Sequence, residues 1–277
     1  MIPAAFDYQR ASTIDEAVEL LGEHGDDAKL LAGGHSLLPL MRLRLAAPAV
    51  LIDIGRLNDL SYVRSDDGQV RIGALTRHHD LGTSDELREQ VPMLAHIAGQ
   101  IGDPQVRHRG TIGGSIAHGD PASDLPAAVL ALRGTLVARG PGGDREIPAD
   151  EMFTGFLETA LAPDEVLTEI RVPATGGAPW GFQKFVRRAQ DWAIVGCAAV
   201  LSNGTSGGPG VGLVHMGATP LRAPGVEEAL RSGASPSEAA ARADEGTEPP
   251  DDLNASAEFR RHLAQVLVRR ALESAQA

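Results

Sequence analysis

Two short stretches that combine glycine pairs with hydroxyl side chains are the residues best suited to chemistry in this sequence. They run from Ala32 to Leu37 and from Thr111 to Ser115. A glycine pair allows positive φ angles and a close approach of the backbone, and successive amides in such a turn form a concave site that binds an anion without lysine. Ser36 and Ser115 add hydroxyl donors, and a hydrogen bond to a charged oxygen contributes about 1.5–3 kcal/mol. Because glycine pairs also occur in plain turns, the residues alone leave two interpretations open, a site for a phosphate-containing ligand and ordinary loop geometry.

The elements around the first stretch predict a small α/β unit. Residues 12–24 are expected to be a capped helix, since Ser12 and Thr13 each precede an acidic residue by three positions. Short apolar strands are expected at residues 29–32 and 50–54, before and after the glycine stretch. The order of helix, strand, glycine turn and strand favours parallel pairing.

The elements around the second stretch predict a mixed antiparallel sheet with helices. Residues 110–115 themselves are expected to form a glycine-rich turn. Helical segments are expected within residues 85–101 and 122–132. Strands are expected at residues 70–74, 135–139 and 166–172.

The character of the chain changes after a linker predicted from Pro173 to Pro179. Beyond it the sequence predicts strands at 181–187, 193–202 and 211–218, a hairpin signal at Asn203-Gly204, and helices at 225–230, 235–242 and 255–274. The predicted fold class is therefore α+β, because strands are followed by helices. Residues 1–175 are expected to form a first domain with subdomains at about 1–54 and 55–175, and residues 178–277 a second domain with a three-stranded sheet and a helical bundle.

The composition narrows the possible partners. The 277 residues carry a formal net charge of −12, which disfavours nucleic acid and anionic membrane surfaces. No segment has the apolar length of a membrane span, and residues 1–10 lack the pattern of a signal peptide, so the cytoplasm is the expected compartment. Cys197 is the only cysteine, so an internal disulfide, a cysteine-ligated iron–sulfur cluster and a structural zinc site are not expected. A chain of this kind that moves electrons needs an organic cofactor and a partner.

Other motifs carry less weight. Residues 204–208 match the letters of a hydrolase nucleophile elbow, but a glycine-rich hairpin loop is not the strand–turn–helix context that this chemistry needs. No HExxH, GxGxxG or GxxxxGK[ST] motif occurs, so zinc protease, Rossmann and P-loop interpretations lose support. The adjacent His78 and His79 point in different directions and make a poor metal pair. The roles of these two residues, and of His108 and His118 beside the second glycine stretch, stay open.

Three longer stretches resemble one known family. Ala32 to Leu45, AGGHSLLPLMRLRL, closely resembles the first FAD-binding motif in the flavoprotein (medium) subunits of the xanthine dehydrogenase and aerobic carbon monoxide dehydrogenase family of molybdenum hydroxylases. Asp103 to Ala127, DPQVRHRGTIGGSIAHGDPASDLPA, is similar to the second motif, and the resemblance extends to Phe182 to Ala193. The order of elements matches over nearly the whole chain, so residues 1–175 are expected to be a two-subdomain FAD-binding domain and residues 178–277 a domain like the C-terminal one of the carbon monoxide dehydrogenase flavoprotein.

The resemblance implies a set of FAD contacts. The two glycine stretches would wrap the pyrophosphate and ribityl chain, Ile101 would pack near the adenine end, and Asp124 would bond the sugar-like part. Lys184 would be a basic residue at the flavin site, Trp192 would lie near the isoalloxazine ring, and Leu167 would offer a backbone contact. The complete predicted site is Ala32, Gly33, Gly34, His35, Ser36, Leu37, Ile101, Thr111, Ile112, Gly113, Gly114, Ser115, Asp124, Leu167, Lys184 and Trp192.

The sequence departs from the family pattern at a few of these positions. His35 stands where many relatives have glutamine, and Ser115 where others have asparagine, and both replacements keep a polar group. Trp192 stands where carbon monoxide dehydrogenases have tyrosine. The cysteine-bearing insert of the hydroxybenzoyl-CoA reductase branch is missing.

The implied function is that of an oxidoreductase subunit. FAD would receive electrons from [2Fe–2S] clusters in a small subunit, which would receive them from a molybdenum–pterin centre in a large subunit, with the whole complex a dimer of heterotrimers. No side chain need act as a catalytic acid, base or nucleophile, because the cofactor carries the redox chemistry, and no metal site is expected in this chain. The alternatives are a free-standing FAD-dependent oxidase or dehydrogenase, a non-redox module for a phosphate-containing ligand, and a scaffold that has lost its cofactor.

The sequence leaves two chemical identities open. A partner would choose the substrate, so carbon monoxide, purines, N-heterocycles and aldehydes all fit. The final acceptor (NAD, quinone or oxygen) and the oligomeric state of the isolated chain do not follow from these residues either.

Overall fold

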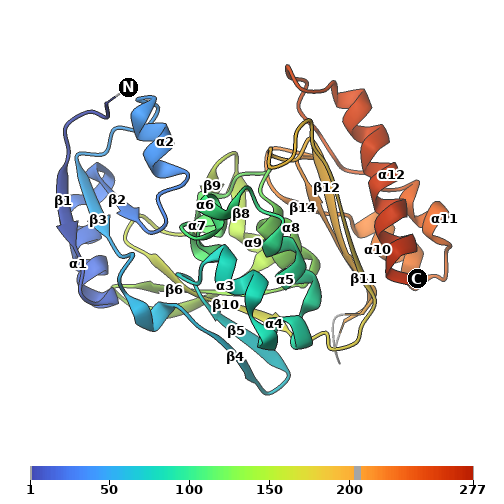
Figure 1. Cartoon of the computed structure of the whole chain (residues 1–277), viewed down its shortest axis with the longest axis horizontal. Helices are drawn as coiled ribbons and strands as arrows, with labels where there is room; N and C mark the ends of the chain where they lie inside the picture. The colour runs from blue at the N-terminus through green and yellow to red at the C-terminus, as the bar shows by residue number, and fades with distance from the viewer. Residues whose placement is uncertain (1, 203–206, 277) are drawn as a thin grey trace.

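The computed structural model describes residues 2–202 and 207–276. The hairpin signal at Asn203-Gly204 and most of the elbow-like stretch at 204–208 lie outside the described residues. Three sheets follow one another across the molecule, from a small N-terminal sheet through a central five-stranded sheet to a C-terminal sheet (Figure 1). No helix in the described ranges has both the length and the apolar character needed to cross a membrane.

The N-terminal unit is a parallel sheet, as predicted. Its strands β1 (Asp7–Arg10), β2 (Ala28–Leu31) and β3 (Val50–Asp53) lie in the order β1-β3-β2 and all pair in parallel. The sequence prediction lacked β1. Helix α1 (Ile14–His24) begins where the Thr13 hydroxyl accepts a hydrogen bond from the amide of Glu16. The short helices η1 (Gly25–Asp27) and α2 (Leu37–Arg42) precede and follow β2.

The central sheet is antiparallel throughout. Its order is β4 (Val63–Asp66), β5 (Gln69–Gly73), β10 (Val166–Pro173), β6 (Thr135–Gly140) and β7 (Gly143–Pro148). A register shift between Leu167 and Glu169 marks a bulge in β10. A 3-10 turn, η2 (Asn58–Leu60), leads into β4, and a two-stranded hairpin of β8 (Phe153–Gly155) and β9 (Glu158–Thr159) lies apart from the main sheet.

Short helices cover the central sheet, and the sequence prediction lacked those at 78–83, 104–107 and 149–152. The helices are α3 (His78–Thr83), α4 (Asp85–Gln90), α5 (Pro92–Gly99), α6 (Pro104–Arg107), α7 (Ile112–His118), α8 (Asp124–Ala131) and α9 (Ala149–Met152). The helical pattern at 85–101 is split at Val91, because the residue before a proline is disfavoured in the helical region.

The second glycine stretch is a helix and not the turn that the sequence predicts. Thr111 caps α7 by accepting a hydrogen bond from the amide of Gly114, and Gly113 and Gly114 lie in its first turn. Glycine disfavours helices, but a Cβ at Gly113 would lie 2.5 Å from the Cβ of Ala74. Close packing against Ala74, which directly follows β5, therefore requires glycine there and overrides its weak helix propensity.

The C-terminal sheet lies between helices on both of its faces. The three predicted strands are β11 (Trp180–Phe185), β12 (Val195–Val200) and β13 (Gly210–Val214), and the two-residue β14 (Leu221–Arg222) extends the sheet beyond them. Helix α8 packs against β12 and β13, while α12 (Ala257–Gln276) covers β11 and β12 on the outer face (Figure 1). Helices α10 (Pro224–Arg231) and α11 (Pro236–Ala240) complete the bundle.

One core joins the central and C-terminal sheets. Phe182, Ala198 and Val200 of the C-terminal sheet pack in the same buried cluster as the apolar residues of α5 and α8. A separate cluster fills the space between the outer face of the sheet and the C-terminal helices. The predicted linker is also tied down, since the amides of Thr175 and Gly176 donate to the carbonyl of Gln90. The division into domains at residues 175 and 178 stays a prediction.

Candidate functional site

A cavity of about 940 Å³ opens between the N-terminal unit, the central helices and the C-terminal sheet. It is at the upper end of the range of about 300–1,000 Å³ that is usual for ligand sites. Fifteen of the sixteen predicted site residues line it, although they come from segments far apart in the chain. The exception is Ile112, whose side chain is fully buried in the core, so that only its backbone lies near the site.

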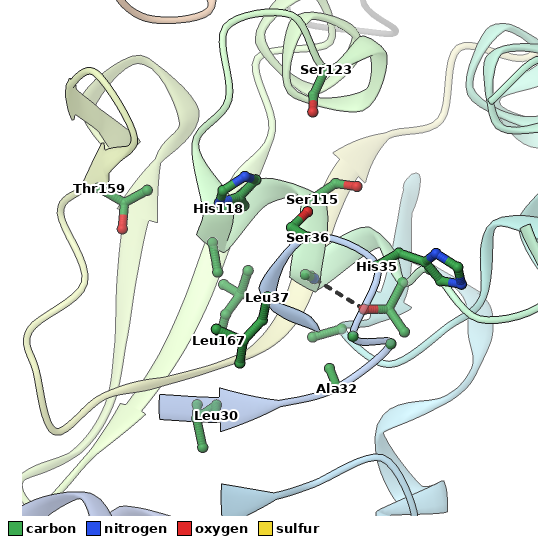
Figure 2. Close-up of a pocket in the computed structure, with 18 of the residues that line it drawn as sticks. Leu30, Ala32, His35, Ser36, Leu37, Ser115, His118, Ser123, Thr159 and Leu167 are labelled. Atoms are coloured by element: carbon green, nitrogen blue, oxygen red, sulfur yellow. Dashed lines mark hydrogen bonds between the residues drawn. The ribbon is translucent and has the colours of Figure 1, made fainter. Parts of the chain in front are cut away.

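The first glycine stretch is a loop between β2 and α2 on the cavity wall. His35, Ser36 and Leu37 follow the end of β2 and lie beside α7 (Figure 2). Gly34 has φ +78°, a conformation that favours glycine. A Cβ at Gly33 would overlap the carbonyl oxygen of Arg109, just before the second stretch. The first loop therefore contacts the backbone of residues 109 and 110 directly, with no side chain between them.

The amides of the first loop are available to a ligand. Among the described residues, no oxygen accepts a hydrogen bond from the N–H groups of residues 33–37. The loop nevertheless turns into α2 normally, because Gly34 and Ser36 accept hydrogen bonds from Leu38 and Leu40. Backbone donors on a cavity wall that lack a partner within the chain are suited to a phosphate oxygen.

The second stretch contributes differently. The amides of Ile112 and Gly113 donate to the carbonyls of Thr76 and Ala74, and that of Gly114 donates to Thr111 Oγ1 at 3.1 Å. These donors are already occupied, so the second stretch offers its surface and its Ser115 hydroxyl. A Cβ at Gly114 would meet a single atom, Thr111 Oγ1 at 2.8 Å. Gly114 therefore keeps the cavity wall open.

His78 lies behind the second stretch and also lines the cavity. Its Nε2 is 3.4 Å from Ser115 Oγ, and its Nδ1 is buried without a partner in the described part of the chain. Burial lowers the pKa of His78 to about 4, with smaller contributions from His35 and two arginines, so the ring is neutral at pH 7. The roles of His78 and His118 were left open by the sequence. His118 lines the cavity together with Ser123 and Thr159 (Figure 2).

A buried ion pair forms another part of the wall. Lys184 Nζ of β11 lies 2.7 Å from Asp124 Oδ2 at the start of α8, and the two side chains are 11% and 4% exposed. Burial raises the pKa of Asp124, and the charge of Lys184 opposes that shift. The second carboxylate oxygen, Oδ1, is buried without a partner among the described residues. An unpaired buried acceptor on a cavity wall fits a hydroxyl or N–H donor of a ligand.

The remaining predicted residues are apolar and surround the cavity. Ile101 follows α5 and is partly buried, and Leu167 lies at the bulge of β10 and is 5% exposed. Trp192 is at the rim and is 59% exposed. The site thus combines backbone donors, a buried carboxylate and apolar walls, as a long ligand with a diphosphate and a polar chain requires. The fold and the cavity are those of a protein that binds a dinucleotide.

Comparisons with known proteins give the family. Residues 4–175 match the family model of the FAD binding domain in molybdopterin dehydrogenase, and residues 180–275 match that of the CO dehydrogenase flavoprotein C-terminal domain. The chain is 44% identical to the carbon monoxide dehydrogenase medium chain of Hydrogenophaga pseudoflava, over 99% of this chain and 98% of that protein. It is 36% identical to the glyceraldehyde dehydrogenase medium chain of Sulfolobus acidocaldarius, with 99% of each chain covered.

Solved structures agree with this assignment. The carbon monoxide dehydrogenase of H. pseudoflava matches with a TM-score of 0.96 at 44% identity, covering 100% of this chain and 99% of that chain. Quinoline 2-oxidoreductase from Pseudomonas putida 86 matches with a TM-score of 0.90 at 30% identity and the same coverage. The chain belongs to the family of FAD-binding medium subunits of the molybdenum hydroxylases, the oxidoreductase family that includes carbon monoxide dehydrogenase and xanthine dehydrogenase.

Proposed function

We propose that this subunit holds FAD in the cavity and carries electrons from [2Fe–2S] clusters of a small partner subunit to a final acceptor. A large subunit with a molybdenum–pterin centre would oxidise the substrate. The observation that carries the proposal is the cavity wall of residues 33–37, whose amide donors have no acceptor among the described residues. When bound, the flavin supplies redox chemistry in one-electron and two-electron steps.

The residues of the chain bind and orient the cofactor. The amides of residues 33–37, with the hydroxyls of Ser36 and Ser115, hold the diphosphate. Asp124 Oδ1 accepts a hydrogen bond from the polar chain of the ligand, and Lys184 pairs with Oδ2 and opposes the rise in the pKa of Asp124 that burial causes. Ile101 packs near the adenine, and Trp192 lies at the rim beside the flavin ring. No side chain is needed as an acid or a base.

The partners are proposed from the names of the relatives. These include medium chains of carbon monoxide and glyceraldehyde dehydrogenases, a nicotine 6-hydroxylase medium subunit and a subunit of a 6-hydroxypseudooxynicotine dehydrogenase complex. Their substrates differ while the subunit is retained, so the substrate is chosen outside this chain. We expect a dimer of heterotrimers.

Purification of the chain with its native partners tests the proposal. The expected complex contains FAD, molybdenum and [2Fe–2S] clusters, and adding substrate bleaches the flavin absorption band. An active flavin-containing single chain without molybdenum or iron would instead support a free-standing oxidase. A purified chain that binds no flavin at all would end the proposal.

A further inference from the structure

The segment of residues 186–193 joins β11 to β12 and forms one rim of the cavity. Gln190, Asp191 and Trp192 line the cavity from this segment. Trp192 is 59% exposed, so packing alone does not fix its indole. The ion pair between Arg188 and Asp191 within the segment is exposed to solvent, and such pairs contribute little. The position of this rim therefore depends on how its two ends are held.

Both ends are held by residues at and before the start of α12. The ring of Phe185 meets that of Phe259 edge-on, with centroids 6.3 Å apart. Arg187 Nη1 lies 3.4 Å from Asn254 Oδ1. At the other end, the amide of Ile194 donates to the carbonyl of Phe185 at 2.9 Å and closes the segment.

Arg260 of α12 is the centre of these contacts. Its side chain is fully buried, and its Nη1 donates to the carbonyl of Ile194. Its Nη2 pairs with Asp252 at 2.8 Å, and Asp252 in turn accepts hydrogen bonds from the amides of Asn254 and Ala255. The Arg260 Nε is buried without a partner in the described part of the chain, so Nη1 and Nη2 alone link the start of α12 and the end of the rim through one charged group.

His215 adds a second link to the same end of the rim. Its Nδ1 lies 2.9 Å from the carbonyl of Ala193 and 3.0 Å from Arg260 Nη1. The residue has φ +62°, and its amide donates to the carbonyl of Pro121 at 2.7 Å. Burial lowers the pKa of His215, so the ring is neutral and its Nδ1 either donates to Ala193 or accepts from Arg260.

We propose that Arg260 is a positioning residue for the FAD cavity, and that it fixes the rim carrying Trp192 through the carbonyl of Ile194. This inference rests on the proposed function, because it concerns the wall of the same cavity. It assigns the C-terminal helix a part in the geometry of the flavin site, although α12 lies on the outer face of its sheet (Figure 1).

The test follows Trp192 directly. In a Trp180→Phe background Trp192 is the only tryptophan, so its fluorescence, and its quenching by bound flavin, report on the rim. Arg260→Met is expected to weaken quenching and to raise the Kd for FAD about tenfold, equivalent to about 1.4 kcal/mol. Arg269→Met is the matched control, because Arg269 lies on the same helix and its side chain is 46% exposed. The Arg269→Met protein should show the same quenching of Trp192 fluorescence and the same Kd for FAD as the parent.

A double-mutant cycle separates positioning from general stability. If Arg260 acts through the rim, Arg260→Met adds little to the effect of Trp192→Ala on FAD binding, whereas independent roles would add. Additive effects, or normal quenching and Kd in a folded Arg260→Met protein, would overturn the inference. Should that variant fail to fold, Arg260→Gln replaces it, because the shorter, uncharged glutamine cannot bond Ile194 and Asp252 together, and parental quenching there counts equally against the inference.

Failure of the proposed function is recognised separately. If the parent protein binds no FAD, the function fails, but the anisotropy of Trp192 in the ligand-free chain still tests the positioning. Arg260→Met should lower that anisotropy, and an unchanged value would contradict the inference.

Discussion

At the scale of single residues, the site depends on which backbone and side-chain groups lack partners. The amides of residues 33–37 and Asp124 Oδ1 have none in the described part of the chain, while the amides of Ile112, Gly113 and Gly114 are already paired. The two glycine stretches look equivalent in sequence but differ in this respect. The first stretch supplies backbone N–H donors, and the second stretch, which lacks a side chain at Gly114, leaves room for the ligand.

Replacing Gly114 with valine tests the role of that space. The new side chain would meet Thr111 Oγ1 and otherwise extend into the cavity, so we expect loss of FAD with a largely intact fold. The measurement is flavin content by absorption together with the far-UV circular dichroism spectrum. Gly142→Val is the matched control, because a Cβ at Gly142 would meet nothing within 4 Å. Full flavin occupancy in Gly114→Val would contradict the site.

Replacing Lys184 with methionine tests the buried pair. The carboxylate of Asp124 would lose its counter-charge, and breaking a buried pair in this way costs about 3–5 kcal/mol. Because burial raises the pKa of Asp124, the folded variant holds its proton more tightly than the unfolded chain does, so stability should fall as pH rises above 3.8. Urea unfolding of the ligand-free protein measures both effects. Adding Asp124→Asn should restore much of the loss, and no rescue would argue against a buried charge.

His78 gives an acid-sensitivity prediction. Its folded pKa of about 4 lies below the ordinary value of 6.5, so the unfolded chain binds its proton first as pH falls. Its contribution to stability is therefore present above pH 6.5 and is lost on acidification to pH 4, to a total of roughly 3 kcal/mol. Urea unfolding at several pH values should show a shallower acid loss in His78→Gln than in the parent. His108→Gln, at an exposed position, should keep the slope of the parent.

At the scale of elements, glycines set how closely helices approach the sheets. A Cβ at Gly181 of β11 would overlap the carbonyl oxygen of Ala271 in α12, and one at Gly212 of β13 would overlap that of Ala127 in α8. Together these positions let one helix on each face lie directly on the C-terminal sheet. They are packing glycines, although in sequence they look like the glycines of the binding loops.

Gly181→Ala should therefore destabilise the protein. Forcing α12 away from β11 is overpacking, which costs about 1–3 kcal/mol. Gly22→Ala in α1 is the matched comparison, because a Cβ there would meet nothing within 4 Å and alanine favours a helix by about 0.5–1 kcal/mol. Thermal melts should move in opposite directions for the two variants. An unchanged melting temperature in Gly181→Ala would mean that α12 can shift away from β11 at little cost in stability.

At the scale of the whole molecule, the cavity is lined by residues of the N-terminal, central and C-terminal regions together. Its walls come from the N-terminal loop, from α7 and α8, and from β11 with the rim of residues 186–193. Glu227, whose side chain is 1% exposed, also joins the parts, since it pairs with Arg133 of the central region and with Arg222 and Arg231 of the C-terminal region. The shared core and this buried cluster join the central and C-terminal parts of the wall.

We expect the central and C-terminal parts to unfold together. Separating them would expose Phe182, Ala198 and Val200 and leave Glu227 without Arg133. In thermal unfolding, circular dichroism and tryptophan fluorescence should report the same transition midpoint for the full chain. Glu227→Ala should lower the midpoints from both measurements by the same amount. Two separated midpoints would show that residues 178–277 form an independent unit.

The sequence by itself determined the family and the fold class and predicted the binding stretches, since these depend on local patterns of glycine, hydroxyl and apolar residues. The matches to the family models and the relatives confirm the family. The tertiary structure decided which amides are free, that the second stretch is a helix, and that Asp124 and Lys184 meet across 60 positions. The reason is physical: hydrogen-bond occupancy, burial and charge pairing depend on distant neighbours, and no local pattern encodes them.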